Sequence, residues 1–262
     1  MRSHRENSLV FDATDDRDLP YVKEVSQLAC RYCAGDPSGW QLADVERLWK
    51  VFIGGRSGIL GIRLDGRVCC VKLYYDGRLR TRLRTMVRLA KSRRAYLHGV
   101  RLARAGVNCP RMLGWAEHRP TGPTMIVTEL IDDGMRLDHW IAKYGVGQGL
   151  PAGLARFVRN MHDHGVTHVD LSPRNIMVRA RDNGYEFLLL DYEDARFPRS
   201  VDRRTRWRDL NHLHERLALC TSLRDRLRFL RVYTLQDYHL YRERLRGMLD
   251  RSTSRYLRPQ VR

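Results

Sequence analysis

The segment from His168 to Asp194 contains the side chains that phosphoryl transfer requires. It begins HVDLSPRNIMV and ends LLLDYEDA. A carboxylate such as Asp170 can orient an attacking hydroxyl and accept its proton, while an amide oxygen of Asn175 and a carboxylate of Asp191 can hold Mg²⁺ against phosphates. A surface loop with incidental acidic residues is the alternative interpretation, because a motif needs its structural context.

Two apolar runs inside this segment predict a β-hairpin. Ile176–Val178 and Phe187–Leu190 are typical of strands, and the polar turn RARDNGY separates them. A hairpin would bring Asn175 and Asp191 side by side at its open end.

A second group of residues, within Leu48–Tyr75, is suited to contact the phosphates of a nucleotide. The pattern predicts a strand, the glycine loop GGRSG, a strand, the turn LDGR and a third strand. Gly54, Gly55 and Gly58 would let the backbone approach phosphates, although no GK[ST] follows and a plain hairpin turn is equally compatible. Lys72 on the third strand would reach the α- and β-phosphates, or else it is an edge-strand lysine.

The remaining patterns predict the elements that position these groups. Arg78–Ala105 is a basic helical stretch that ends at GVNCP. The strand Thr124–Ile131 runs into a polar DDG connector, which is typical of a hinge whose backbone, at Glu129 and Ile131, pairs with a purine; an ordinary edge strand has the same pattern. Further helices are predicted at Leu137–Lys143, before HDHG, and after Trp207.

Composition limits the class of partner and the compartment. The 262 residues carry a formal charge of +18, mostly from arginine, which favours nucleic acid, an anionic membrane surface or a phosphorylated substrate. The sequence has no RNA-recognition aromatic signature and no zinc-finger spacing, so a dedicated nucleic-acid module is not expected. Solvated helix faces are the alternative explanation for most of this charge. The polar N-terminus lacks the apolar core of a secretory signal, and no apolar run approaches a membrane span of about 20 residues, so a cytoplasmic protein with free cysteines is expected.

Together the patterns predict an α+β protein with two lobes. Residues 1–45 form an N-terminal extension with a short helix, residues 46–131 a β-rich N-lobe, and residues 132–262 a mostly helical C-lobe.

In order and spacing these parts resemble a protein-kinase-like fold, and more narrowly the lipopolysaccharide core (Kdo/heptose) kinase family of Gram-negative bacteria. The resemblance lies in LARAGVNCP, HVDLSPRN, LLLDYEDAR and the RxxRWRDLNHL helix that follows. It implies an ATP- and Mg²⁺-dependent kinase that phosphorylates a sugar hydroxyl of lipid A–core. It also implies a place at the cytoplasmic face of the inner membrane, where arginine would face anionic lipid.

The same resemblance implies a role for each site residue. Asp170 would be the catalytic base, Asn175 and Asp191 the metal ligands, and Lys72 the phosphate anchor. His168 would hold the catalytic loop without reacting.

The chain departs from the kinase pattern in three places. Ser172 stands where many protein kinases keep a lysine, so Arg174 is the candidate for positive charge near the transferring phosphoryl group. No Asp or Glu occurs from Gly77 through Ala116, where the kinase fold places a glutamate that pairs with the strand lysine. Glu193, two residues after Asp191, is a second possible metal ligand, or else a solvent-facing acid.

Two other functions remain open at this stage. The DYED segment also resembles aminoglycoside and choline phosphotransferases, but their cationic substrates fit an arginine-rich C-lobe poorly. A non-catalytic kinase-like module that docks on membrane or nucleic acid is favoured by the missing glutamate, whereas the complete set of Asp170, Asn175 and Asp191 counts against it.

Overall fold

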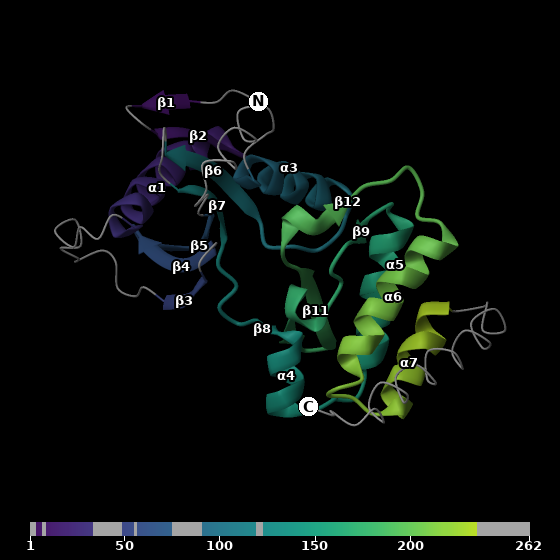
Figure 1. Cartoon of the computed structure of the whole chain (residues 1–262). Coiled ribbons are helices and arrows are strands. Elements are labelled where there is room, and N and C mark those ends of the chain that lie inside the picture. The colour runs from purple at the N-terminus through teal and green to yellow at the C-terminus, as the bar shows by residue number, and fades with distance from the viewer. Residues whose placement is uncertain are drawn as a thin grey trace, which may run out of the picture. The chain divides into compact units, whose positions relative to one another are not determined.

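A computed structural model describes residues 4–6, 9–33, 49–54, 57–74, 91–118 and 123–234 of the chain (Figure 1). They fall into two compact units, Met1–Arg104 with Pro110–Asp132 and Ala105–Cys109 with Asp133–Arg262. The predictions for Gly55, for the basic stretch before Lys91 and for the chain after Thr234 lie outside the described residues. None of the described helices is long and apolar enough to cross a bilayer.

The first unit is built on a seven-stranded sheet of order β1-β2-β6-β7-β5-β4-β3, with antiparallel neighbours. Its strands are β1 (His4–Glu6), β2 (Leu9–Ala13), β3 (Trp49–Gly54), β4 (Ser57–Leu64), β5 (Arg67–Tyr74), β6 (Met112–His118) and β7 (Thr124–Glu129). The strands predicted on both sides of the glycine loop and after GVNCP are therefore present.

Two helices pack on opposite faces of this sheet. Helix α1 (Leu19–Cys33) buries its apolar face in a cluster that includes Val71 of β5 and Val127 of β7. Side chains alternate along a strand, so the neighbours of Val71 and Val127 point to the other face. On that face Trp115 lies 5.7 Å from the Arg93 guanidinium of α3 (Lys91–Arg104).

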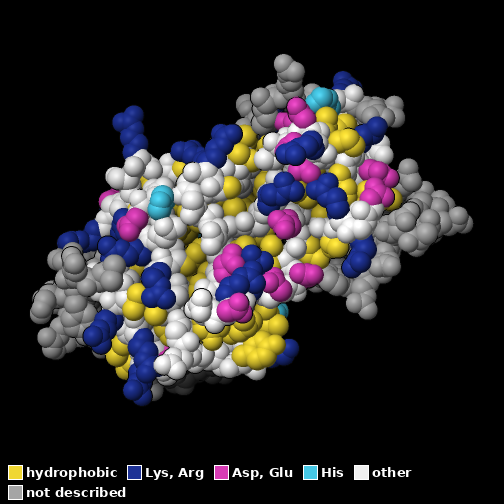
Figure 2. All heavy atoms as spheres, turned by 180° about the vertical axis from the view of Figure 1, so that it is seen from behind, with side chains coloured by type: hydrophobic (Ala, Val, Ile, Leu, Met, Phe, Trp, Pro, Cys, Tyr) yellow, Lys and Arg dark blue, Asp and Glu magenta, His cyan; other side chains and the backbone are white. Residues whose placement is uncertain are grey.

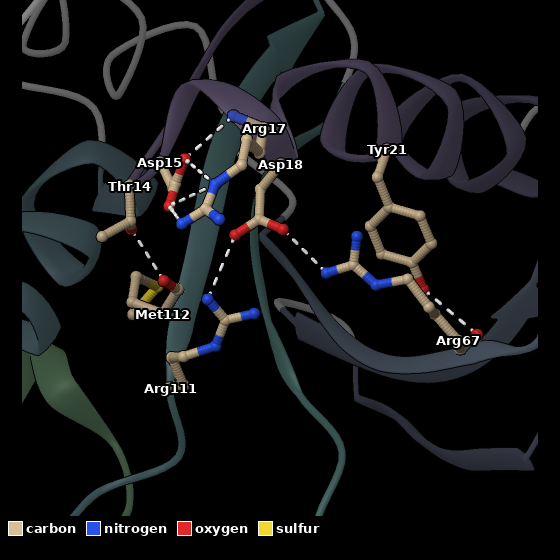
Figure 3. Close-up of polar contacts among 8 residues, drawn as sticks. All are labelled: Thr14, Asp15, Arg17, Asp18, Tyr21, Arg67, Arg111 and Met112. Carbon is tan, nitrogen blue, oxygen red and sulfur yellow. Dashed lines mark hydrogen bonds and ion pairs between the residues drawn. The ribbon is translucent and has the colours of Figure 1, made fainter.

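A buried carboxylate joins the N-terminal segment to the sheet (Figure 3). Asp18, only 5% exposed, lies at the end of a short 3-10 helix, η1 (Asp16–Asp18), and accepts from Arg67 Nη2 at 2.7 Å and from Arg111 Nη1 at 3.2 Å. The Arg67 guanidinium also lies 4.3 Å from the centre of the Tyr21 ring, and the Tyr21 hydroxyl donates to the Arg67 carbonyl. Residues expected as an extension with a short helix thus contribute two strands, a helix and the two ion pairs of Asp18 to the first unit.

The second unit is mostly helical. Its helices are α4 (Leu137–Tyr144), α5 (Leu150–Asp163), α6 (Arg203–Leu217) and α7 (Leu223–Thr234). Its short strands are β8 (Met135–Arg136), β9 (Thr167–His168), β10 (Ile176–Arg181), β11 (Gly184–Leu189) and β12 (Ala195–Arg196), and its 3-10 helices are η3 (Pro173–Asn175) and η4 (Tyr192–Asp194). The apolar faces predicted for the helices are buried, as the exposures of Leu154, Leu213 and Leu230 show.

Charged side chains are spread over the surface. On the face shown in Figure 2, Lys and Arg side chains lie among Asp and Glu side chains instead of forming one separate basic region. Ion pairs in the second unit, such as Arg179 with Glu186 and Arg181 with Asp133, neutralise part of the arginine charge. Solvated, partly paired arginine therefore explains much of the charge on this face.

Replacing Asp18 by Asn should destabilise the first unit by about 2 kcal/mol, because two charged hydrogen bonds to a buried carboxylate are lost. The free energy of unfolding in urea measures this effect. The exposed neighbour Asp16, replaced by Asn, is the matched control and should leave the unfolding midpoint nearly unchanged. Equal midpoints for the two variants would show that the Asp18 ion pairs do not hold the N-terminal segment in place.

A histidine in the second unit should make stability depend on pH. His214 is buried, and its Nε2 lies 3.1 Å from Nη1 of Arg226, so this nitrogen accepts a hydrogen bond as long as the ring is neutral. Burial, followed by the charge of Arg226, lowers the pKa of His214 from 6.5 to about 4. Between these values the unfolded chain binds a proton that the folded chain excludes.

The free energy of unfolding should therefore fall by about 2–3 kcal/mol as the pH drops from 6.5 to 4. His214→Gln keeps an acceptor without titrating, so its stability should fall less steeply over this window in urea unfolding series. His162, whose pKa burial also lowers, and the acidic residues account for the slope that remains. The exposed His139, replaced by Gln, should retain the full slope; a wild-type slope in the His214 variant would contradict the assignment.

Candidate active site

The catalytic loop lies between β9 and β10 of the second unit. The Asn175 side-chain nitrogen donates to the Asp170 carbonyl at 2.9 Å and to Oδ2 of Asp170 at 3.1 Å. The amide therefore turns its nitrogen to Asp170 and its oxygen away from it. These two hydrogen bonds orient the Asp170 carboxylate and occupy the amide nitrogen, not the amide oxygen, of Asn175.

The predicted hairpin is present and places the two candidate metal ligands next to each other. Strands β10 and β11 pair from Ile176 with Leu189 to Arg181 with Gly184. At the open end the Leu190 N–H donates to the Asn175 carbonyl at 2.8 Å, and Asp191 follows at once. The sequence spacing thus brings Asn175 and Asp191 together through backbone pairing.

Asp191 has a left-handed backbone, with φ 60° and ψ 59°. A residue with a side chain adopts this conformation at a cost, and such residues concentrate at functional positions. The Asp191 carbonyl accepts from His168 Nε2 at 3.0 Å and from the Asp194 N–H at 3.1 Å. Because a carbonyl only accepts, His168 Nε2 carries the proton, which favours a holding role for the buried imidazole.

A second carboxylate, which sequence reasoning missed, lies beneath the loop. Asp209 of α6 is fully buried, and its Oδ2 accepts from the His168 N–H at 3.1 Å and faces His162 Nε2 at 3.3 Å. His162 Nδ1 in turn lies 2.7 Å from the hydroxyl of Tyr233 on α7. The signal in the sequence was an acid flanked by Trp207 and Leu210 on an apolar helix face.

Asp170, the candidate catalytic base, lines an open cavity of about 220 Å³ within the second unit. The Asp170 side chain is 49% exposed, and its Oδ1 lies 2.9 Å from His212 Nε2, with the ring N–H not aligned for a hydrogen bond. Arg174, 76% exposed, also lines this cavity. A substrate hydroxyl can therefore reach Asp170 from solvent, close to a guanidinium group.

The oxygen-rich side chains at the hairpin fit a magnesium ion. Asn175, Asp191 and Glu193 offer amide and carboxylate oxygens, the donors that Mg²⁺ prefers, and Mg²⁺ fills its other positions with water and phosphates. Glu193 is only 6% exposed, so the alternative of a solvent-facing acid is wrong. Among the described residues no three His, Cys, Asp or Glu side chains gather as a metal cluster.

The first unit contains the residues predicted to bind nucleotide. Lys72 lies on β5 between β4 and β7, so the alternative of an edge-strand lysine is wrong. It pairs with Ile126, which pairs with Trp115, so all three share the sheet face covered by α3. The Lys72 ammonium lies 5.4 Å from the centre of the Tyr74 ring.

The glycines and the hinge have distinct positions in the same unit. Gly54 ends β3 opposite Ser57, whereas Gly58 is buried inside β4 and is not available to contact phosphates from a loop. Glu129 ends β7, and its N–H donates to the Arg111 carbonyl at 2.9 Å. A purine would therefore meet the carbonyl of Glu129 or the segment at Ile131.

Removing the buried carboxylate of Asp209 should disturb the catalytic loop from below. Asp209→Ala leaves the His168 N–H buried without an acceptor, so we expect a loss of about 2–4 kcal/mol in unfolding free energy. Hydrogen exchange at Thr167–Val169 should also accelerate. Arg204→Ala, an exposed change on the same helix, serves as the control; unchanged exchange in the Asp209 variant would show that the loop is held by other contacts.

The sequence profile described as "Lipopolysaccharide kinase (Kdo/WaaP) family" matches residues 70–233, more than half of the chain. A solved structure, WaaP in complex with acyl carrier protein, is similar at a TM-score of 0.58 and 22% identity, over 81% of this chain and 88% of that chain. This likeness confirms the protein-kinase-like fold with its β-rich and helical lobes.

Two other proteins are similar over smaller shares of their length. Calcium/calmodulin-dependent protein kinase type I of Schizosaccharomyces pombe is 32% identical over 82 residues, which is 28% of this chain and 24% of that protein. The chain therefore spans about a quarter of that curated relative. A crystal structure of Rad53 in complex with AMP-PNP has a TM-score of 0.46 and 17% identity, over 79% of this chain and 57% of that chain.

Proposed function

Because the chain belongs to the lipopolysaccharide kinase (Kdo/WaaP) family, we propose that it transfers the γ-phosphoryl group of ATP, with Mg²⁺, to a sugar hydroxyl of lipopolysaccharide core. The observation that carries this proposal is the geometry at Asp170. Its carboxylate borders a cavity and accepts a hydrogen bond from the Asn175 side chain. The Asn175 carbonyl in turn accepts the N–H of the residue before Asp191.

Asp170 positions the acceptor hydroxyl and takes its proton as the bond to phosphorus forms. Asn175 holds the carboxylate through Nδ2, so the carboxylate does not need to reorient during the transfer. His168 and Asp209 keep the loop rigid from below. Catalysis then comes from positioning and from electrostatic stabilisation, as in other phosphoryl transfers.

The metal and the nucleotide have their own candidate ligands. Asn175 Oδ1, Asp191 and Glu193 would hold Mg²⁺, which when bound neutralises charge on the transferring phosphates. Arg174 lies on the cavity wall, where its guanidinium can meet the negative charge of the transferring group. Lys72 and the glycine-rich segment with Gly54, Gly55 and Gly58 would contact the other phosphates, and Glu129 and Ile131 would contact the purine.

The proposed place of action is the cytoplasmic face of the inner membrane. A formal charge of +18 supports peripheral contact with anionic lipid and with phosphorylated saccharide. The charge is spread over the face in Figure 2, so we expect weak contact that depends on ionic strength.

The first experiment is transfer of labelled phosphate from Mg²⁺-ATP to dephosphorylated lipopolysaccharide core. Asp170→Asn should lower the rate by about 10²–10⁴-fold, because the proton acceptor is lost while the shape of the side chain is kept. Asp182→Asn, at the exposed turn of the same hairpin, is the matched control and should keep the wild-type rate. An aminoglycoside mixture and a generic protein serve as competing acceptors.

Each outcome separates the proposal from its alternatives. Label on the core that Asp170→Asn abolishes supports the saccharide kinase, whereas label on the aminoglycosides supports the small-molecule phosphotransferase. If the wild type binds Mg²⁺-ATP, Asp191→Ala abolishes this binding and no acceptor is labelled, the protein binds nucleotide at the proposed site but uses an acceptor that was not tested. Absence of Mg²⁺-ATP binding in the wild type would favour the non-catalytic module and explain the missing helix glutamate.

A further inference from the structure

The cavity beside Asp170 has a second wall that the proposed transfer does not use. The catalytic loop forms one side, and the end of α6 with the turn after it forms the other. The lining side chains are those of Asp138, Asp170, Ser172, Pro173, Arg174, Arg216, Leu219 and Cys220. All of them belong to the second unit.

Positive charge exceeds negative charge at this cavity. Asp138 is held by Arg136, whose Nε lies 3.0 Å from its Oδ1, and this pair neutralises itself. Although partial burial acts to raise it, the hydrogen bond from Arg136 holds the pKa of Asp138 below its usual value. Two guanidinium groups, those of Arg174 and Arg216, then face the single carboxylate of Asp170.

Arg216 is the cation whose role the fold leaves open. No hydrogen bond or ion pair joins its guanidinium to any other residue in the part of the chain that the structure describes, and the residue is exposed. Arg174 is only weakly engaged, since its Nε lies 3.9 Å from the nearer Asp138 oxygen. An anion from outside the protein can therefore bind to Arg216 without displacing an internal partner.

The carboxyl end of α6 repels an anion less strongly than an uncapped helix end would. The carboxyl end of a helix carries partial negative charge on its last carbonyls. Here the Leu217 carbonyl accepts from the N–H groups of Cys220 and Thr221 and from the Thr221 hydroxyl at 2.7 Å. These donors offset the partial charge, so the full charge of Arg216 dominates this wall.

We propose that Arg216 binds an anionic substituent of the acceptor saccharide, a phosphate or a carboxylate, while a neighbouring hydroxyl lies against Asp170. A guanidinium fork matches both kinds of anion in two-point geometry. The cavity of about 220 Å³ is smaller than the roughly 300–1,000 Å³ that drug-sized ligands need, so it suits one sugar ring. This inference rests on the proposed function and adds Arg216 as a residue that selects the acceptor.

A kinetic test uses three acceptors that share one sugar ring: the neutral sugar, its phosphate ester and its sugar acid. In the wild type, kcat/KM should favour one or both charged sugars over the neutral sugar, and the stronger of the two identifies the anion. Arg216→Ala should lower that preference about ten- to a hundredfold, mainly through KM, and Arg216→Lys should restore part of it. Arg203→Ala, an exposed change at the other end of α6, should keep the wild-type preference.

A binding test needs no catalysis and keeps the inference separate from the proposed function. Cys220 is exposed in the same cavity, so its alkylation at pH 8.5–9, followed by mass spectrometry of its peptide, reports occupancy. This pH range is needed because burial raises the pKa of the thiol. A charged sugar should slow alkylation in the wild type and in Asp170→Asn, but not in Arg216→Ala, and the neutral sugar should have little effect.

The two tests distinguish failure of the anion site from failure of the proposed kinase activity. Protection of Cys220 by a charged sugar without any phosphate transfer would retain the anion site and overturn the proposed kinase activity. Transfer that prefers neither charged sugar, or protection that persists in Arg216→Ala, would overturn the role of Arg216. An unchanged thermal unfolding midpoint of Arg216→Ala ensures that these differences arise at the cavity.

Discussion

A buried carboxylate organises the active site of the second unit. Asp209 accepts the backbone N–H of His168 and faces the ring of His162, so α5, α6 and the catalytic loop meet at one side chain. The His168 ring then holds the Asp191 carbonyl. The positions of Asp170 and Asp191 therefore both depend on Asp209, a residue to which we assign no contact with metal or acceptor.

Two carboxylates of the same unit have opposite surroundings and hence different tasks. Asp209 is fully buried and its oxygens are taken up by His162, His168 and Arg208, which makes it a fixed acceptor. Asp170 is half exposed and borders a cavity, so it can exchange protons with a substrate. The fold thus separates the group that positions the loop from the group that we propose to react.

The sequence pattern predicted those parts of the candidate site that are built by backbone pairing between neighbouring segments of the chain. The hairpin follows from alternating strands and a polar turn, and it alone brings Asn175 to Asp191. Contacts across the fold were not predictable from such patterns: Asp209 lies 41 residues from His168, and the interior place of Lys72 depends on β7 pairing with β5. In the sequence, Arg216 likewise does not differ from other surface arginines. Its place at the cavity follows only from the packing of α6 beside the catalytic loop.

The left-handed backbone of Asp191 has a consequence for how this protein can change over generations. Glycine and asparagine adopt that conformation readily, whereas β-branched residues do so only with strain. Each of these two residues is a single nucleotide substitution away from an aspartate codon. A lineage can therefore lose the carboxylate that we propose binds Mg²⁺ with little penalty in folding, and an inactive descendant would keep the shape of an active one.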